Sequence, residues 1–276
     1  MRLDVLSPDE VLAGYDAVSR LYPHIPPMSI WRAWEYGAYR RYALPEPVLD
    51  VGRGDGRFFR LLRPRVRDVV GVEIDVGVAE AARRSGVYRE VHVAPAHQAP
   101  APPESFASAF ANCSLEHMDH LPEVLRSISR SVCPGASFLL SVVTDRFLEW
   151  AALPCLMAAL GEPARARALR AEYEAYHHLV NPLPAETWVE RLERAGFEVL
   201  EHVPLLPELT SRLFLFLDHL WHVPRPGGEL GDSLFPFLTT LSDFPAAFRQ
   251  VLAGVMRMER DWSTGSGAVF QARMKP

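Results

Sequence analysis

Three glycines follow a short apolar run in the first fifth of the chain and form its clearest candidate binding motif. The run covers residues 48–51, and the glycines are Gly52, Gly54 and Gly56. Glycine adopts positive φ without a steric cost, so such a turn allows a close approach of backbone to ligand. A buried strand, a glycine turn and a helix form the nucleotide-binding start of an open α/β sheet.

Two further residues indicate which ligand this turn would accept. The dinucleotide fingerprint G-x-G-x-x-G needs a glycine where this chain has Arg57. Asp50 lies just before the first glycine, and a carboxylate there repels a pyrophosphate but attracts a cation. S-Adenosylmethionine has an adenosine, an ammonium group and no phosphate, so the turn favours this ligand over NAD.

The stretch Pro47–Gly56 resembles motif I of the class I S-adenosylmethionine-dependent methyltransferases, of the type 11/12-like kind. Arg53 stands where a small residue or Cys is more usual. The resemblance covers roughly residues 46–144, with weaker support at 185–206 and 266–275. It implies an α/β fold with a Rossmann-like seven-stranded sheet of order 3-2-1-4-5-7-6, whose last strand is antiparallel.

The resemblance also implies roles for residues of the turn and of the next strand. Gly52, Arg53, Gly54 and Gly56 would form the donor cradle, and Asp50 would hold the methionine end, directly or through water. The second strand, residues 68–73, ends on Glu73, about 20 residues past the glycines, where such folds place an acid for the ribose. Glu73 is therefore expected to bind the ribose, with Ile74 beside it. Asp75 is the competing candidate, but it is better placed to cap a helix over 76–85.

The adenine contact departs from the family pattern. An acid usually stands near the start of the loop after strand three, where this chain has Pro95, Ala96 and His97. Backbone groups of Ala96 and His97 are expected to read the adenine edge instead, and Gln98 is a possible substitute. Catalysis by His97 is the weaker idea, because loop histidines are more often solvated.

The third strand is expected at about 87–93 and the fifth at 137–143. The fourth strand, residues 105–112, leads into a loop that resembles the L-E-H loop of the family. This loop lies where strand order reverses and ligands bind, so Asn112 and Cys113 are expected to face the methyl donor. Glu116 and His117 either act in acid–base chemistry or fix the loop and begin the next helix. Polar pairs at such loops are often structural, which favours the second interpretation.

Methyl transfer from a sulfonium needs orientation and exclusion of water more than any one catalytic group. Where an acceptor needs a general base, His177 and His178 are the first candidates, ahead of His117, because an unperturbed histidine has a pKa near about 6.5. The competing interpretation of His177 and His178 is that they suit a helix C-terminus. Tyr173 and Tyr176 would instead line an apolar acceptor pocket.

The pattern predicts a helical N-terminal segment, residues 1–45, before a methyltransferase domain that spans 46–276. Its second helix, expected over 29–42, carries many aromatic residues and is either a cap on the core or a lid over the ligand mouth. Two helical insertions are expected, at about 145–184 and about 207–262, and the first is expected to contain one helix over 147–160 and one over 163–179.

The late insertion is richly apolar and is either a roof over the substrate, a homodimer interface or a membrane-facing surface. Its few arginines favour roof or dimer over an anionic lipid surface. Apolar walls favour a small or medium-sized apolar or aromatic acceptor.

Composition excludes several other classes. The net charge of −5 gives no electrostatic grip on nucleic acid, and the three cysteines form no C-x-x-C pair, so no metal site is indicated. No signal peptide or transmembrane segment is apparent, which predicts a cytoplasmic protein. Two alternatives to a methyltransferase stay open. They are an NAD-dependent oxidoreductase and a catalytically silent protein that binds S-adenosylmethionine.

Overall fold

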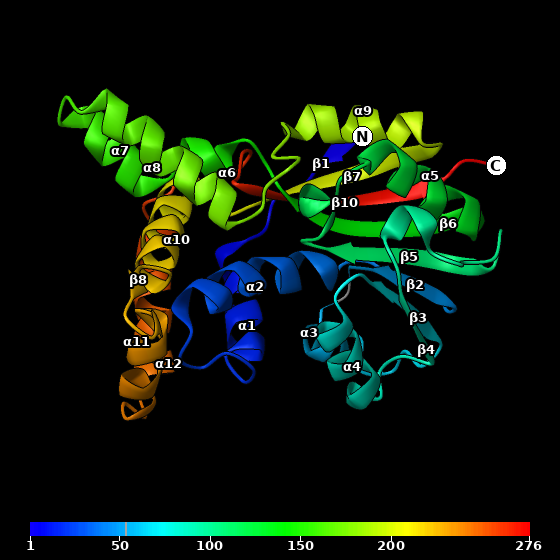
Figure 1. Cartoon of the computed structure of the whole chain (residues 1–276), viewed down its shortest axis with the longest axis horizontal. Helices are drawn as coiled ribbons and strands as arrows, with labels where there is room; N and C mark the ends of the chain where they lie inside the picture. The colour runs from blue at the N-terminus through cyan, green and yellow to red at the C-terminus, as the bar shows by residue number, and fades with distance from the viewer. Residues whose placement is uncertain (53) are drawn as a thin grey trace.

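A mixed eight-stranded sheet organises the computed structural model, which describes residues 1–52 and 54–276 (Figure 1). The strand order is β1-β7-β10-β6-β5-β2-β3-β4, and β10 is antiparallel to both of its neighbours. The predicted class, order and antiparallel last strand are confirmed. The strands are β1 (Arg2–Leu3), β2 (Val48–Val51), β3 (Val69–Glu73), β4 (Glu90–Val93), β5 (Phe106–Asn112), β6 (Val132–Val143), β7 (Phe197–Leu205) and β10 (Gly267–Met274).

The sheet has one strand more than the predicted seven. β1 pairs in parallel with β7, where Arg2 lies opposite Glu201 and Leu3 opposite His202. A strand of two residues is too short to show an alternating pattern, so its pairing depends on contacts far away in the sequence. The N-terminal residues therefore join the sheet, and the division of the chain at residue 45 stays a prediction.

Helices cover both faces of the sheet, because its central strands are parallel and buried. On one face lie α5 (Leu121–Ser131) and α9 (Ala185–Arg194), and on the other lie α2 (Pro26–Tyr39), α3 (Arg57–Leu62) and α4 (Val76–Ser85) (Figure 1). Side chains of β2 alternate between the two cores: Val48 belongs to the α2 side and Leu49 and Val51 to the α5 side. This alternation fixes β2 at the centre of the molecule.

The N-terminal helices are packing elements. Ser7 and Glu10 form a capping box at the start of α1 (Pro8–Val18), which satisfies its first backbone donors. α2 begins at Pro26 rather than at the predicted Ser29, since proline suits the first turn of a helix. Trp34 of α2 is fully buried, so the helix packs on the core, and its role as a lid stays a prediction.

Several element boundaries differ from the predictions. Asp75 caps α4 as expected, with Oδ1 accepting a 2.7 Å hydrogen bond from the Val78 N–H. β4 begins at Glu90 rather than Val87, and β6 begins at Val132 rather than Ser137.

The first insertion contains three helices, α6 (Arg146–Glu149), α7 (Ala152–Ala159) and α8 (Pro163–Tyr176). The single helix predicted over 147–160 is wrong, because the chain breaks at Trp150 and Ala151. Pro154 explains the break, since a proline is tolerated in the first turn of α7 but not inside a longer helix.

The second insertion forms a projecting lobe beside α1 and α2 (Figure 1). It consists of α10 (Glu208–Trp221), the hairpin β8 (Pro224–Arg225) and β9 (Gly228–Glu229), α11 (Gly231–Thr239) and α12 (Phe244–Met256). None of the helices within the described ranges is long and apolar enough to cross a membrane.

Candidate functional site

A cavity of about 330 Å³ opens at the carboxyl ends of β2, β3 and β4. This is the edge of a parallel sheet at which ligands bind in open α/β folds. The described lining consists of Gly52, Val72, Glu73, Ile74, Ala94, Pro95, Ala96, His97, His117, Met118, Asp119, His120 and Val124.

The glycine turn forms one wall of this cavity, and its glycines have different environments. Gly52 has φ +67°, and a Cβ on it would lie 2.4 Å from Ser114 Cβ, so the residue is needed for close packing. Gly54 has φ +58°, and a Cβ there would meet no heavy atom within 4 Å. A Cβ on Gly56 would lie 2.7 Å from the Tyr88 ring, behind the turn. Arg53, the remaining predicted cradle residue, lies outside the described residues.

Glu73 is held rigidly at the end of β3. Its Oε1 accepts hydrogen bonds from the backbone N–H groups of Ile74 (2.9 Å) and Asp75 (3.2 Å). Ile74 is 68% exposed and adds an apolar wall beside the carboxylate. A carboxylate in this setting can accept hydrogen bonds from the vicinal hydroxyls of a ribose, while the apolar wall can pack against a base.

Asp50 does not line the cavity. It is 1% exposed, and its Oδ2 accepts a 2.7 Å hydrogen bond from the Tyr88 hydroxyl. Because the Tyr88 ring packs behind Gly56, this pair braces the glycine turn from the side away from the cavity. A direct contact of Asp50 with the methionine end stays a prediction.

The predicted adenine residues lie together at the far end of the cavity. Ala96 and His97 belong to a 3₁₀ turn, and both line the cavity. The His97 ring lies 5.1 Å from that of His120. Our sequence reasoning missed Met118, Asp119 and His120, although they directly follow the recognised L-E-H loop and so carried a usable signal.

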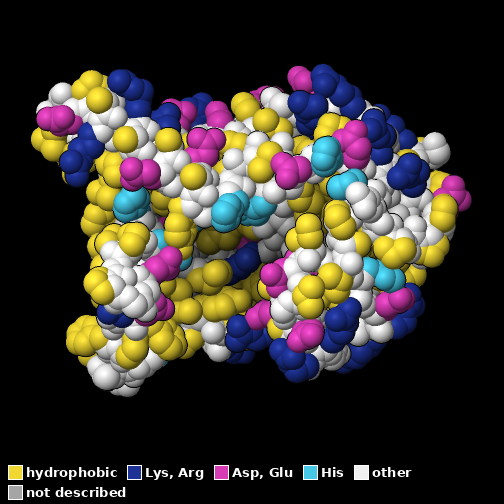
Figure 2. Space-filling model, in the orientation of Figure 1, with side chains coloured by type: hydrophobic (Ala, Val, Ile, Leu, Met, Phe, Trp, Pro, Cys, Tyr) yellow, Lys and Arg dark blue, Asp and Glu magenta, His cyan; other side chains and the backbone are white. Residues whose placement is uncertain are grey.

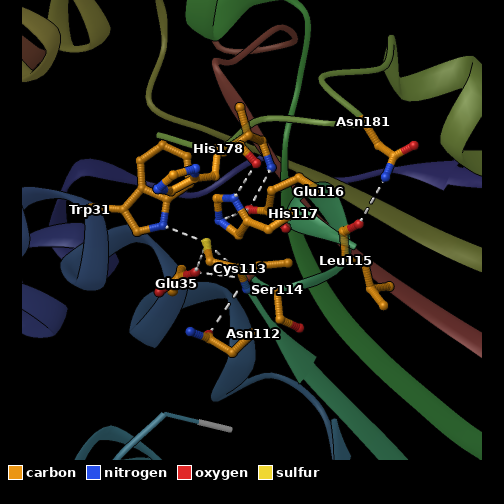
Figure 3. Close-up of polar contacts among 12 residues, drawn as sticks. Trp31, Glu35, Asn112, Cys113, Ser114, Leu115, Glu116, His117, His178 and Asn181 are labelled. Carbon is orange, nitrogen blue, oxygen red and sulfur yellow. Dashed lines mark hydrogen bonds and ion pairs between the residues drawn. The ribbon is translucent and has the colours of Figure 1, made fainter. Parts of the chain in front are cut away.

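Asn112 and Cys113 lie next to α2, where Cys113 is close to Trp31 and Glu35 (Figure 3). Cys113 has φ +45°, and its sulfur accepts a 3.0 Å hydrogen bond from Trp31 Nε1. The Cys113 thiol donates to Glu35 Oε1, also at 3.0 Å. Burial raises the pKa of Cys113 well above its usual value, and the Glu35 charge adds to this effect, so the thiol stays protonated.

Glu35 is the centre of this polar cluster and was missed by the sequence reasoning. It is 0% exposed, its Oε1 accepts a 2.6 Å hydrogen bond from the Ser141 hydroxyl, and its Oε2 pairs with Arg32. The sequence did carry a signal for Glu35, because it is an acid inside a helix rich in aromatic residues, one turn after Trp31.

His117 lines the cavity with a fixed orientation. Its Nδ1 lies 3.2 Å from the His178 carbonyl oxygen, so Nδ1 carries the proton and Nε2 is the free acceptor. Burial lowers the pKa of His117, so the ring is neutral at pH 7. Glu116 beside it is 0% exposed, and burial raises its pKa to about 8.

The three candidate bases are not brought together around one point. His177 lies in the helical insertion, with Nε2 2.9 Å from Asp218 Oδ2. His178 has an exposed side chain and lines a surface depression together with His117 and Asp119, which also line the cavity. Tyr173 is 4% exposed and donates to Asp218, and Tyr176 bonds to His222 and Glu229. These tyrosines therefore join α8 to the second insertion.

Figure 2 shows a deep hollow between the projecting lobe and the side of the molecule that carries α3 and α4. We call this hollow the central cleft. α2 runs along its floor, and its visible surface is mainly hydrophobic, with basic side-chain atoms at its back.

The described residues fit a nucleoside-bearing ligand without phosphates. The cavity is lined by the carboxylates of Glu73 and Asp119, and none of its described lining residues is Lys or Arg. The open space at Gly54 leaves room for a ligand to approach the backbone of the glycine turn.

Comparisons with known proteins agree with this geometry. A family model described as a methyltransferase domain matches residues 31–202. Malonyl-[acyl-carrier protein] O-methyltransferase of Serratia marcescens is 26% identical over 104 residues, or 38% of this chain and 41% of that protein. The chain thus spans about two fifths of the length of this curated relative.

Solved structures show the same fold at low identity. A possible histamine N-methyltransferase of Thermotoga maritima superposes with a TM-score of 0.57 at 17% identity, covering 95% of this chain and 98% of that one. Geranyl diphosphate C-methyltransferase of Streptomyces coelicolor A3(2), solved with Mg²⁺, geranyl diphosphate and S-adenosyl-L-homocysteine, gives a TM-score of 0.51 at 16% identity, covering 87% and 74%.

Proposed function

The chain belongs to the methyltransferase-domain family, and from that premise we propose that it transfers a methyl group from S-adenosylmethionine to a small or medium-sized, apolar or aromatic acceptor. The resemblance to class I methyltransferases found in the sequence is confirmed by the family model, which matches more than half of the chain. S-Adenosylmethionine is the methyl donor of this family, and S-adenosylhomocysteine is its product.

The position of Glu73 in the cavity is the observation that carries the proposal. Glu73, Ile74 and the Ala96–His97 turn would hold the adenosine, and the glycine turn would hold the methionine part. The donor, when bound, supplies a methyl group already activated by a positive sulfur. The protein then has to orient the two partners and exclude water.

The central cleft supports the proposed acceptor class. Its hydrophobic surface, which α2 lines, suits an apolar or aromatic molecule (Figure 2). Sites for small molecules are mainly apolar, with a few polar groups that fix orientation.

Among the candidate bases, His117 is the one whose position suits proton transfer. It lines the donor cavity, it is neutral at pH 7, and its free Nε2 is set by the His178 carbonyl. His177 is engaged with Asp218 instead, and the side chain of His178 faces solvent.

Ligand-dependent melting separates the proposal from its alternatives. S-Adenosylhomocysteine should raise the melting temperature and NAD should not, because ligands stabilise only the state that binds them. A rise with NAD alone would contradict the proposal. Donor binding without turnover across a panel of phenols, amines and carboxylic acids would favour the catalytically silent alternative.

We further propose that the projecting lobe is the homodimer interface. Its outer face exposes large apolar side chains, and such patches mark interaction surfaces. These are Phe235, Phe237, Leu241, Val251 and Met258. Phe237→Glu should shift the sedimenting species from dimer to monomer, and a wild-type monomer would refute this interface. The cytoplasmic location stays a prediction.

A further inference from the structure

The end of the first insertion is tied by hydrogen bonds to the turn that forms a wall of the donor cavity. The turn spans residues 115–118, and the tying segment spans residues 178–181, directly after α8. The two segments are separated by more than 60 residues of sequence. Figure 3 shows them side by side, with His178 over His117 and Asn181 directed at the Leu115 carbonyl.

Asn181 makes the central contacts of this clamp. Its side-chain Nδ2 donates to the carbonyl oxygens of Met118 (2.8 Å) and Leu115 (3.3 Å). Its backbone N–H donates to the Glu116 carbonyl (2.8 Å), which also accepts from the Val180 N–H (2.9 Å). One residue thus satisfies carbonyl groups on three of the four residues in the turn.

The carbonyl groups of Glu116 and Met118 need partners from outside the turn, whereas that of Leu115 also accepts from the Met118 N–H (3.2 Å). Leu115 and Glu116 are 0% exposed, and a short 3₁₀ turn leaves most of its own carbonyl groups unpaired. A buried carbonyl group without a partner is costly, so the turn would have to move if the clamp were lost. The chain reaches its clamping position through His178 at φ +49°, a conformation that is uncommon for a residue other than glycine.

The 115–118 turn carries side chains that line the cavity for the methyl donor. His117 and Met118 line the cavity, and a Cβ on Gly52 would come within 3.0 Å of the Met118 methyl carbon. A displacement of the turn therefore changes both the cavity and the packing of the glycine turn. The clamping segment in turn belongs to the insertion that borders the central cleft.

We propose that Asn181 is a positioning residue that sets the donor cavity by holding the 115–118 turn, and that it couples the order of the α6–α8 insertion to donor binding. The proposal rests on the proposed function, since it concerns the same donor cavity. Coupling of this kind is reciprocal, so binding of S-adenosylhomocysteine must also stabilise the clamp and the C-terminal end of α8.

The first test measures S-adenosylhomocysteine binding by calorimetry. Asn181→Ala should weaken binding by about fivefold to tenfold, because part of the binding free energy is then spent on ordering the turn. Asn181→Asp should weaken it at least as much at pH 8, since a carboxylate would face the carbonyl oxygens of Leu115 and Met118. Gln250→Ala, which removes an exposed amide from α12, is the control and should leave the affinity unchanged.

Two readouts separate positioning from general loss of structure. Lowering the pH should improve binding by Asn181→Asp relative to Asn181→Ala, because a protonated Asp regains one donor. In hydrogen exchange, S-adenosylhomocysteine should protect residues 115–118 and 173–181 together in the wild-type protein, and this joint protection should disappear in Asn181→Ala.

The outcomes also separate this proposal from the function proposed above. A wild-type protein that does not bind S-adenosylhomocysteine contradicts the proposed function. A wild-type protein that binds it, with equal affinity and equal exchange in Asn181→Ala, overturns the clamp alone. If Asn181→Ala does not fold, Asn181→Ser keeps one donor group and should show an intermediate affinity.

Discussion

The Tyr88 hydroxyl donates a 2.7 Å hydrogen bond to Oδ2 of Asp50, at the end of the central strand β2. Both side chains are buried, so the acid that precedes the glycine turn is anchored from behind by a residue 38 positions away. The geometry of the turn therefore depends on a contact outside the motif itself.

Tyr88→Phe tests this brace. Removing a hydrogen bond to a buried charged group should lower the free energy of unfolding by about 1.5–3 kcal/mol. It should also weaken S-adenosylhomocysteine binding, because the glycine turn loses support. Tyr36→Phe is the matched control, since the Tyr36 hydroxyl makes no hydrogen bond among the described residues. Equal stability of the two variants in urea would contradict the brace.

Glu35→Gln should be strongly destabilising. The change leaves the buried side of Arg32 without its charge partner, and breaking a buried ion pair costs about 3–5 kcal/mol. Arg32→Met combined with Glu35→Gln should recover part of the loss, because no unpaired charge remains. Denaturant unfolding of Glu35→Gln, of Arg32→Met and of the double variant measures this. The pairing would be refuted if the destabilisation of the double variant equalled the sum of the two single destabilisations.

The stability of the protein should depend on the ionisation of Glu116. Burial raises its folded-state pKa to about 8 from 4.5, so between these values the folded state holds a proton that the unfolded state has released. The free energy of unfolding must then fall as pH rises through this window. Glu116→Gln removes this dependence.

We therefore expect Glu116→Gln to gain stability relative to the wild type as the pH rises from about 5 to about 8, by an amount on the order of a few kcal/mol. Melting curves at matched pH values measure the difference. A difference that stays constant over this range would show that Glu116 is already ionised in the folded protein.

His222 should act in the same sense, because its folded-state pKa is raised as well. Burial alone would lower its pKa, but hydrogen bonds to Asp218 and Glu229 outweigh this and raise it. Its stabilising contribution is present below the unfolded pKa of 6.5 and is lost as pH rises through the raised folded value. His222→Gln should thus be less stable than the wild type at about pH 6, with a deficit that shrinks by about pH 9. A deficit that grows with pH would contradict this assignment.

Local sequence patterns were sufficient for the parts of the fold that short segments determine. The run of residues 48–51 with its three glycines identifies β2 and the turn, because burial on both faces and positive φ leave clear residue preferences. Asp75 was recognised as a helix cap for a similar reason, since its partner Val78 is three residues away.

Contacts between distant segments were not predictable in this way. Glu35 looked like any helical acid, and its partners Cys113 and Ser141 come from other strands. The Asn181 clamp joins an insertion to a family motif, and an insertion has no family pattern to compare. His177 was expected near the acceptor, but the structure directs it to Asp218, which lies on a helix 41 residues later.

The most direct test of the central claim is calorimetric titration of S-adenosylhomocysteine into the wild-type protein and into Glu73→Ala. The account predicts one site per chain in the wild type. It predicts a loss of about tenfold or more in Glu73→Ala, because the ribose hydroxyls lose hydrogen bonds to a charged group. The control Glu80→Ala, on the exposed face of α4, should bind as the wild type does. No binding by the wild type, or equal binding by Glu73→Ala, would contradict the donor site described above.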